Sequence, residues 1–174
     1  MADGTCLQLD VGNSSAKWRL VRGGEVLFRG NYVHGAAASA EKMLACPVPA
    51  RIWVASVASP EKESALVSLL ASRWEVEPWF ARTERQTGGL HNSYADPARM
   101  GVDRWLAMLG AWARSSERLC VVDAGSALTI DLVSASGRHE GGYIIPGPAL
   151  MERALLLDTG RVRFDEAGDY ALDP

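Results

Sequence analysis

The sequence predicts a mixed α/β fold in which one strand motif occurs twice. Residues 5–33 contain strand patterns joined by short polar turns, and residues 118–147 repeat the order of strand, Asp-x-Gly turn, strand, glycine turn and strand. Helical and strand patterns alternate between these two motifs, as is typical of α/β proteins. We therefore expect two related lobes, each beginning with a β-meander.

The first motif is predicted from apolar segments separated by turn residues. Gly23-Gly24 marks one turn, and the polar residues after Asp10 mark the other. Connections this short join neighbouring antiparallel strands, so we expect a three-stranded antiparallel meander. Its strand segments are TCLQLDV, SAKWRLV and EVLFRGNYV, at residues 5–11, 15–21 and 25–33.

Helices and further strands are expected between the two motifs. Residues 36–45 and 60–73 have helical patterns, and the second begins with proline, which suits the first turn of a helix. Residues 51–57 predict a buried strand, and residues 74–80 predict another strand. Residues 84–94 are rich in glycine and polar side chains, which indicates a loop.

A further helix is predicted to begin at Asp96-Pro97 and to extend over residues 98–116. Aspartate is a good N-cap, and proline is favoured at the first helical position. Asp103 lies on a helix face whose later residues are small enough to admit a ligand or another element. A separate, apolar face is formed at helical spacing by Val102, Trp105, Leu106, Leu109 and Trp112.

The two motifs can be aligned with each other. The Asp-x-Gly turn that begins at Asp10 corresponds to the one that begins at Asp123, whereas the second strands align only after a gap of one residue. This alignment divides the chain into a first lobe over residues 1–117 and a second over residues 118–174. Because the second copy stops after one helix and an acidic tail, we expect its lobe to be incomplete.

Composition restricts the classes of partner. The chain has 174 residues, 48% hydrophobic and 22% charged, as expected for a globular protein with a real core. The net charge is −3 with both signs interspersed, which argues against binding to nucleic acid or an acidic membrane surface. No segment approaches the roughly 20 apolar residues of a membrane span, and no secretory leader is recognisable. We expect a cytoplasmic protein that binds a small molecule.

Cysteine and histidine spacing indicates neither a disulfide framework nor a metal site. Cys6, Cys46 and Cys120 are far apart and odd in number, so reduced, buried thiols are expected. We expect structural or surface roles for the histidines, although His91 can also enter a substrate pocket beside Tyr94. These histidines are His34, His91 and His139.

The Asp-x-Gly turns suit phosphate chemistry. After Asp10, glycine allows close approach of the backbone, three polar residues follow as hydrogen-bond donors, and the carboxylate can hold a metal ion. Lys17 and Arg19 share one face of the next strand and can reach phosphate oxygens, although a solvated strand charge explains Arg19 at least as well. A single such turn is also an ordinary hairpin, but two of them can hold opposite sides of a nucleotide across a cleft.

Asp131 is another acid within an apolar strand pattern. It can face the same cleft as Asp123, or it can be buried with hydrogen-bonding partners. The second alternative is favoured, because a buried carboxylate normally requires such partners.

Four motifs together resemble the type III pantothenate kinases, also described as the Bvg accessory factor family. They are, in order, LDVGNSSAKW, MGVDRW, VVDAGSALTIDL and GGYIIPG. The resemblance covers residues 7–163, and members of that family are longer at the C-terminus. It implies an acetate and sugar kinase/actin-like fold with two ribonuclease H-like lobes, and a homodimer with active sites near the subunit interface.

The resemblance also implies an activity, namely ATP-dependent phosphorylation of pantothenate to 4′-phosphopantothenate, the first step of coenzyme A biosynthesis. The ligands implied are ATP, pantothenate, Mg²⁺ and a monovalent cation, K⁺ or NH₄⁺. Asp103 matches the proton acceptor, Asp123 matches the monovalent-cation ligand, and Ser126 takes the place of a threonine that contacts ATP. The segment for ATP phosphates matches Asp10, Val11, Gly12, Asn13, Ser14, Ser15, Ala16 and Lys17, and the pantothenate site matches Tyr94, Gly101, Val102, Asp103 and Arg104.

Some of these assignments have alternatives in the chemistry of the residues. Asp10 is a candidate ligand for Mg²⁺ as well as part of the ATP motif. Arg104 can bind the substrate carboxylate, or it can form an exposed ion pair on its helix. Family segments that complete the ATP and substrate sites fall beyond Pro174, so the 174-residue form is expected to be weakly active or inactive.

Two other functions stay open from the sequence. A ribonuclease H-like nuclease can gather Asp10, Asp103 and Asp123 around two metal ions, but it needs a basic surface for its polyanionic substrate. A non-catalytic regulatory or interaction protein on the same scaffold is the stronger rival. ATP consumption that depends on pantothenate distinguishes the kinase from both.

Overall fold

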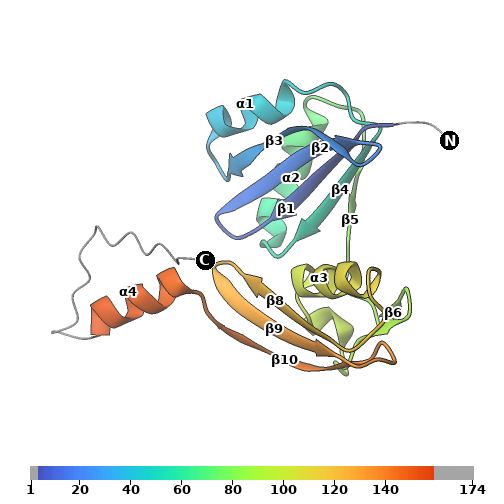
Figure 1. Ribbon diagram of the computed structural model, residues 1–174. Coiled ribbons are helices and arrows are strands. Elements are labelled where there is room, and N and C mark those ends of the chain that lie inside the picture. The colour runs from blue at the N-terminus through green and yellow to red at the C-terminus, as the bar shows by residue number, and fades with distance from the viewer. Residues whose placement is uncertain (1–3, 159–174) are drawn as a thin grey trace, which may run out of the picture.

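The computed structural model describes residues 4–158, which form two lobes that each contain a β-sheet (Figure 1). The first sheet has the strand order β3-β2-β1-β4-β5. Strands β1 to β3 are antiparallel neighbours, and β4 and β5 run parallel to β1. This confirms the predicted meander. Its strands are β1 (Cys6–Val11), β2 (Ser15–Arg22), β3 (Glu25–Val33), β4 (Arg51–Ser56) and β5 (Pro78–Phe80).

Strand β5 is shorter than the segment predicted over residues 74–80. The backbone N–H of Trp74 still donates to the Leu70 carbonyl, at the end of the preceding helix, and the indole is buried in the core. Only Pro78–Phe80 pair with β4. The apolar pattern of residues 74–77 therefore comes from packing against the helix and not from strand pairing.

Helices α1 (Ala37–Leu44) and α2 (Pro60–Ala71) pack on one face of the first sheet. Their buried side chains include Met43, Leu66 and Leu70, which join alternate residues of the strands in one core. The opposite face has no helix from this lobe, so Trp53 in β4 is 43% exposed between two buried neighbours. Strand β4 is thus buried on one face only, whereas the sequence predicted a fully buried strand.

The second sheet repeats the antiparallel meander in the order β10-β9-β8. It consists of β8 (Leu119–Ala124), β9 (Ala127–Val133) and β10 (His139–Pro146), and helix α4 (Pro148–Asp158) follows. The repeated motif is therefore present in the fold. The first turn closes between the N–H of Gly12 and the carbonyl of Ser15, and the second between Gly125 and Ala127, each at 2.9 Å. The one-residue gap in the alignment lies in this turn.

The segment between the lobes differs most from expectation. Residues predicted as a loop form a small hairpin of β6 (Gln86–Thr87) and β7 (Leu90–His91). Its turn is Gly88-Gly89, with φ values of 56° and 85° that favour glycine.

The helix predicted from Asp96 is divided into two parts. Asp96 does accept a hydrogen bond from the Ala98 N–H, but only the 3₁₀ turn η1 (Pro97–Arg99) follows it. The α-helix, α3 (Val102–Trp112), begins three residues later. The hydroxyl of Thr83 donates to the Met100 carbonyl, and the Met100 side chain is buried, so tertiary contacts hold this residue in extended backbone.

Helix α3 packs on the second sheet, against β8 and β9 (Figure 1). Val102, Trp105 and Met108 are buried, whereas Leu106 is 38% exposed. The inward face thus contains Met108 in place of the predicted Leu106. The lobe boundary at residue 117 stays a prediction, although side-chain packing groups α3 with the second motif. The second core consists of Leu90, Met100, Trp105, Met108 and Val133.

The three cysteines are free thiols, as expected. Cys6 and Cys46 are buried, and burial raises the pKa of both thiols. Cys120 is exposed, which contradicts the prediction of a buried thiol, because it lies on β8 at the edge of the second sheet. Among the described residues, no helix is both long and apolar enough to cross a membrane.

Candidate active site

The turn between β1 and β2 presents several polar groups to solvent. Asp10, next to last in β1, is exposed and lies opposite Lys17 in β2. The side chains of Asn13, Ser14 and Ser15 are also exposed, and none forms a hydrogen bond with another residue of the described part of the chain. The turn therefore offers hydrogen-bonding side chains and an ammonium group, as an anion-binding turn requires, beside a carboxylate that can hold a metal ion.

Gly12 has its place in this turn because of space rather than backbone conformation. Its φ is not positive, so other residues can adopt the same backbone. A Cβ atom at Gly12 would lie 3.3 Å from the carbonyl oxygen of Ser15, which is a tight contact. Glycine at this position thus lets the turn close tightly, whereas the approach of its backbone to a phosphate stays a prediction.

Two side chains from other elements hold the turn. The Nε2 atom of His34 lies 2.9 Å from the Gly12 carbonyl oxygen, and the His34 backbone N–H donates to the Ser14 carbonyl. Because a carbonyl only accepts, Nε2 carries the hydrogen. On the other side, the ammonium group of Lys62 in α2 donates to the Asn13 carbonyl. His34 has a structural role, as expected, but nothing in its sequence position indicated which segment it holds.

Two of the acids predicted to act together influence the carboxylate of the third. Loss of surrounding water raises the pKa of Asp10, Lys17 lowers it, and the charges of Asp103 and Asp123 raise it again. The net effect is a raised pKa. The beginning of α3 and the two Asp-x-Gly turns therefore share one electrostatic environment, although they come from three separate parts of the sequence.

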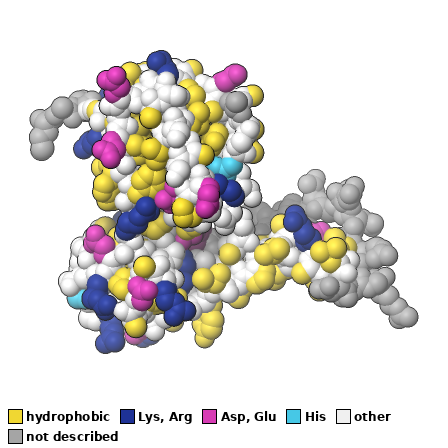
Figure 2. All heavy atoms as spheres, turned by 180° about the vertical axis from the view of Figure 1, so that it is seen from behind, with side chains coloured by type: hydrophobic (Ala, Val, Ile, Leu, Met, Phe, Trp, Pro, Cys, Tyr) yellow, Lys and Arg dark blue, Asp and Glu magenta, His cyan; other side chains and the backbone are white. Residues whose placement is uncertain are grey.

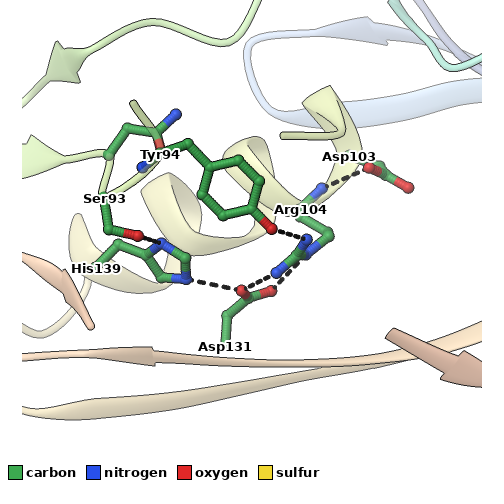
Figure 3. A network of polar contacts seen from close by, with 7 residues as sticks. Ser93, Tyr94, Asp103, Arg104, Asp131 and His139 are labelled. Carbon is green, nitrogen blue, oxygen red and sulfur yellow. Dashed lines mark hydrogen bonds and ion pairs between the residues drawn. The ribbon is translucent and has the colours of Figure 1, made fainter. Parts of the chain in front are cut away.

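Asp103 occupies the first turn of α3, where a carboxylate is favoured by the helix dipole. Its Oδ1 accepts a hydrogen bond of 2.8 Å from the Arg104 backbone N–H, while Oδ2 has no partner among the described residues (Figure 3). A Cβ atom at Gly101 would lie 2.5 Å from Oδ1. Glycine at this position thus makes room for the observed orientation of Asp103.

Asp123 and Ser126 belong to the corresponding turn of the second sheet. Both are exposed, and Asp123 lies opposite Thr129 in β9. The Ser126 carbonyl accepts a hydrogen bond from the Gly147 N–H at 3.0 Å. A Cβ atom at Gly147 would lie 2.4 Å from the Gly125 carbonyl oxygen, so only glycine lets the start of α4 pack this closely on the turn.

A cavity of about 830 Å³ lies on the face of the first sheet that α1 and α2 leave uncovered. Asp10, Lys17 and Arg19 line it together, as expected for side chains on one face of adjacent strands. Asp103 and Asp123 are not among its lining residues, so this cavity is not shared by all three acids. Figure 2 shows acidic and basic side chains together at the waist between the lobes.

The guanidinium of Arg104 is buried and not exposed to solvent. It is 3% exposed, and its Nε donates to Asp131 Oδ2 at 3.0 Å while Nη2 donates to Asp131 Oδ1 (Figure 3). Its Nη1 donates to the hydroxyl of Tyr94 at 3.2 Å. The surface ion pair considered from the sequence is therefore wrong. The alternative role is to bind a substrate carboxylate, but the guanidinium already donates hydrogen bonds to Asp131.

Asp131 is buried with partners, as the favoured sequence argument predicted. Burial alone would raise its pKa, but hydrogen bonds from His139 and Arg104 hold it below the ordinary value. The same carboxylate raises the pKa of Arg104 further above its normal range. The pair is therefore charged at neutral pH.

Sequence reasoning missed Ser93 and placed His139 only in general terms. The Nε2 atom of His139 lies 2.9 Å from Asp131 Oδ1, and its Nδ1 lies 2.8 Å from the hydroxyl oxygen of Ser93. No local motif marks these contacts, because the partners are distant in sequence. His91 instead lines a separate surface cavity, whose lining does not include Tyr94.

Within residues 4–158, no three His, Cys, Asp or Glu side chains come together as a metal-binding group. Asp10, Asp103 and Asp123 therefore lack the close cluster that a two-metal nuclease needs. Asp10 and Asp123 still offer exposed carboxylate oxygens, which suit hard cations such as Mg²⁺ or K⁺ when other ligands supply the remaining oxygens.

Comparison with known proteins relates the chain to one family. The family model described as type III pantothenate kinase matches residues 6–171. The type III pantothenate kinase of Hahella chejuensis is 43% identical over 170 residues, which are 96% of this chain and 67% of the relative. That of Marinobacter nauticus is 41% identical over 92% of this chain and 66% of its own length. The chain spans about two thirds of the length of these relatives.

Solved structures show the same fold at lower identity. A conserved protein of the Baf family from Campylobacter jejuni aligns with a TM-score of 0.54 at 21% identity, over 97% of this chain and 68% of its own. A Sinorhizobium meliloti protein described as a 2-dehydro-3-deoxygalactonokinase aligns with a TM-score of 0.50 at 15% identity, over 86% and 56%. The fold is that of the acetate and sugar kinase/actin-like proteins.

Proposed function

The chain belongs to the type III pantothenate kinase family, and from this premise we propose that it provides ATP-dependent phosphorylation of pantothenate to 4′-phosphopantothenate, the first step of coenzyme A biosynthesis. The observation that carries the proposal is the turn after Asp10, where the exposed side chains of Asn13, Ser14 and Ser15 lie beside the Asp10 carboxylate and Lys17. This turn is the first of the four family motifs.

We assign the phosphates of ATP to the turn after Asp10. The exposed side chains of Asn13, Ser14 and Ser15 supply donors, and Lys17 supplies a positive charge on the adjacent strand. In phosphoryl transfer the protein acts mainly by alignment and by neutralising charge, so a turn held from two sides by His34 and Lys62 suits the task. Ser126 is assigned to ATP from the corresponding turn of the second sheet.

Asp103 is assigned as the proton acceptor. The pantothenate hydroxyl oxygen forms a bond to the γ-phosphorus of ATP, the bond from that phosphorus to the bridging oxygen breaks, and the hydroxyl proton passes to the carboxylate. Oδ2 is suited to receive it, because Oδ1 already accepts from the Arg104 N–H. The positive end of the helix dipole favours negative charge at this position.

Pantothenate is assigned to the segment of Tyr94 and to residues 101–104. The Tyr94 hydroxyl accepts from Arg104 and still has its own hydrogen to donate to the substrate carboxylate. Val102 is buried, so its contribution is through backbone groups. The Arg104 charge is balanced by Asp131, which makes Tyr94 the more direct contact.

Mg²⁺ and a monovalent cation fit the exposed carboxylates of Asp10 and Asp123, respectively. When bound, such cations neutralise charge on the transferring phosphoryl group. The homodimer and the cytoplasmic location expected from the sequence stay predictions.

The test uses two forms of the protein. One is the 174-residue chain, and the other is the same chain extended with the C-terminal third of the Hahella chejuensis relative. Each is incubated with ATP, Mg²⁺, K⁺ and pantothenate, and phosphopantothenate is sought by mass spectrometry. We expect product from the extended form and none from its Asp103→Asn variant. ATP consumption that does not depend on pantothenate would contradict the proposal. Binding of ATP or pantothenate without turnover in both forms would favour the regulatory alternative.

A further inference from the structure

The carboxylate of Asp131 accepts hydrogen bonds from two different segments of the chain. Arg104 donates through Nε to Oδ2 and through Nη2 to Oδ1, and His139 donates through Nε2 to Oδ1 (Figure 3). All three side chains are at most 3% exposed. Asp131 is therefore the centre of a polar cluster from which water is excluded.

One of these connections continues to the loop before α3. Because a carboxylate only accepts, Nε2 of His139 carries a hydrogen, and Nδ1 lies within hydrogen-bond distance of the Ser93 hydroxyl oxygen, at 2.8 Å. The His139 ring also lies 6.1 Å from the Tyr94 ring, centroid to centroid. Asp131 thus holds, through His139, the backbone segment that carries Tyr94.

The other connection continues to the start of α3. Arg104 directly follows Asp103 in the first turn of that helix, and its Nη1 donates to the Tyr94 hydroxyl. The Arg104 and Ser93 connections therefore end on two neighbouring segments that are not otherwise part of one element. The carboxylate of Asp131 thus links both segments, beside the direct hydrogen bond from Arg104 to Tyr94.

Fold stability is a weak reason for such a cluster. Well-packed apolar residues of similar volume are often as stabilising as a buried ion pair, because charges lose their hydration on burial. A hydrogen-bonded pair adds directional contacts, which restrict orientation more sharply than apolar packing does. The cluster is thus better suited to fixing orientation than to adding stability.

We propose that Asp131 is a positioning residue of the substrate site, which orients the Tyr94 segment and residues 101–104 through His139 and Arg104. This inference rests on the proposed function, because that function assigns these two segments to pantothenate. Asp131 itself has no access to substrate, since it is 1% exposed. It acts only through the side chains that it holds.

Ser93, His139 and Asp131 share their residue types with hydrolytic triads, but their arrangement differs. In those triads the acid binds Nδ1 and the serine binds Nε2, whereas here the two ring nitrogens are exchanged. Asp131 is also neutralised by Arg104, so it has little charge left to stabilise a protonated ring. We therefore assign these residues to positioning and not to nucleophilic catalysis.

The test uses mild variants, because Asp131→Asn risks misfolding by leaving a buried charge unpaired. Ser93→Ala removes only the outer hydrogen bond. His139→Gln keeps an N–H donor for Asp131 but has no polar atom at the position of Nδ1, which contacts Ser93. Ser136→Ala is the matched control, because its hydroxyl contacts only Ser134 in the turn between β9 and β10.

Hydrogen exchange on the 174-residue chain gives the first readout. In Ser93→Ala and His139→Gln we expect exchange of residues 92–95 and 100–105 to rise by about tenfold, as for the loss of one buried hydrogen bond, while β1 and β4 keep the wild-type rates. Ser136→Ala should match the wild type. Unchanged exchange in both variants, or an equal rise throughout the chain, would overturn the proposal.

Steady-state kinetics on the extended form gives the second readout. We expect the KM for pantothenate to rise by about tenfold in Ser93→Ala and His139→Gln, with the KM for ATP within about twofold of wild type. A wild-type KM for pantothenate in both variants would overturn the positioning role. If no form phosphorylates pantothenate but exchange still rises locally, the orienting effect of Asp131 is supported and the proposed function fails.

Discussion

The imidazole of His34 lies 2.9 Å from the carbonyl oxygen of Gly12, so the end of β3 is bonded to the turn that follows β1. The turn has few internal contacts of its own, because its side chains are exposed and one backbone hydrogen bond closes it. Its shape therefore depends on groups from β3 and α2. We expect changes in those groups to weaken the binding of ATP more than the binding of pantothenate.

Replacement of His34 by alanine removes the hydrogen bond to Gly12. We expect the KM for ATP to rise by about five- to tenfold, because the phosphate-binding turn loses one of its supports, and the KM for pantothenate to stay within about twofold. Steady-state kinetics on the extended form measures both. His91→Ala, an exposed histidine in β7, is the control. An ATP requirement equal to that of wild type would rule out this role for His34.

Lys62→Met removes the ammonium group that donates to the Asn13 carbonyl. We expect weaker ATP binding by about three- to tenfold, with a smaller difference at high salt, because a positive charge beside the phosphates is lost. Lys62→Arg should restore part of the affinity. Arg73→Met is a matched control, since Arg73 also donates to a backbone carbonyl, that of Leu44, away from the turn. Equal losses in both variants would contradict a local effect of Lys62.

Gly101→Ala introduces a Cβ atom at 2.5 Å from Asp103 Oδ1. We expect kcat to fall by about tenfold or more, because the proton acceptor is displaced by a fraction of an ångström to an ångström. Gly110→Ala on the same helix is the control, since its Cβ would meet nothing within 4 Å. That control should keep full activity and gain slightly in stability, as alanine favours helix. Full activity of Gly101→Ala would show that Asp103 tolerates displacement.

Asp10→Asn should abolish activity and stabilise the fold at neutral pH. The pKa of Asp10 is raised in the folded protein, so ionisation costs stability as pH rises from the unfolded-state pKa of 3.8 through the higher folded-state pKa. Above that window the neutral asparagine avoids the cost, and we expect a slightly higher melting temperature at pH 7, because Asp10 is exposed and solvent screens the effect. The difference should shrink as the pH falls through that window, where Asp10 takes up its proton. Thermal denaturation at several pH values measures it, and a lower melting temperature at pH 7 would contradict the argument.

Asp123→Asn keeps the shape of the second turn but removes the negative charge. We expect the concentration of K⁺ needed for half-maximal activity to rise by about tenfold, and the ATP requirement to rise with it, because a carboxylate ligand is lost. Glu117→Gln, an exposed acid that lies two residues before β8, serves as the control. A dependence on K⁺ identical to that of the wild type would contradict the role of Asp123 as a ligand of the monovalent cation.

The repeated motif was predictable because its signals are local. Strand alternation and the turns after Asp10 and Asp123 depend on neighbouring residues, so both meanders and their correspondence are evident without coordinates. The start of α3 was not predictable in this way. It is set by the contact of Thr83 with Met100, which interrupts a helix that capping signals at Asp96 favour.

The same distinction applies to the candidate site. The acids stand out because charged residues interrupt apolar strand patterns, and Asp131 was recognised for this reason. Lys62 and Ser93 gave no such signal, since they are ordinary surface-type residues whose partners lie 49 and 46 positions away in the sequence. Only tertiary structure brings these partners together.

The unequal length of the two Asp-x-Gly turns means that duplication has not left interchangeable halves. The turn of the first hairpin is one residue longer than that of the second. The shorter second turn packs closely against the start of α4. Such a difference in turn length suits the two different ligands proposed for them, the phosphates of ATP at the first turn and a monovalent cation at Asp123 in the second. Deleting one residue from the first turn would make the two turns equal in length, and we expect it to weaken the proposed contacts with the phosphates of ATP.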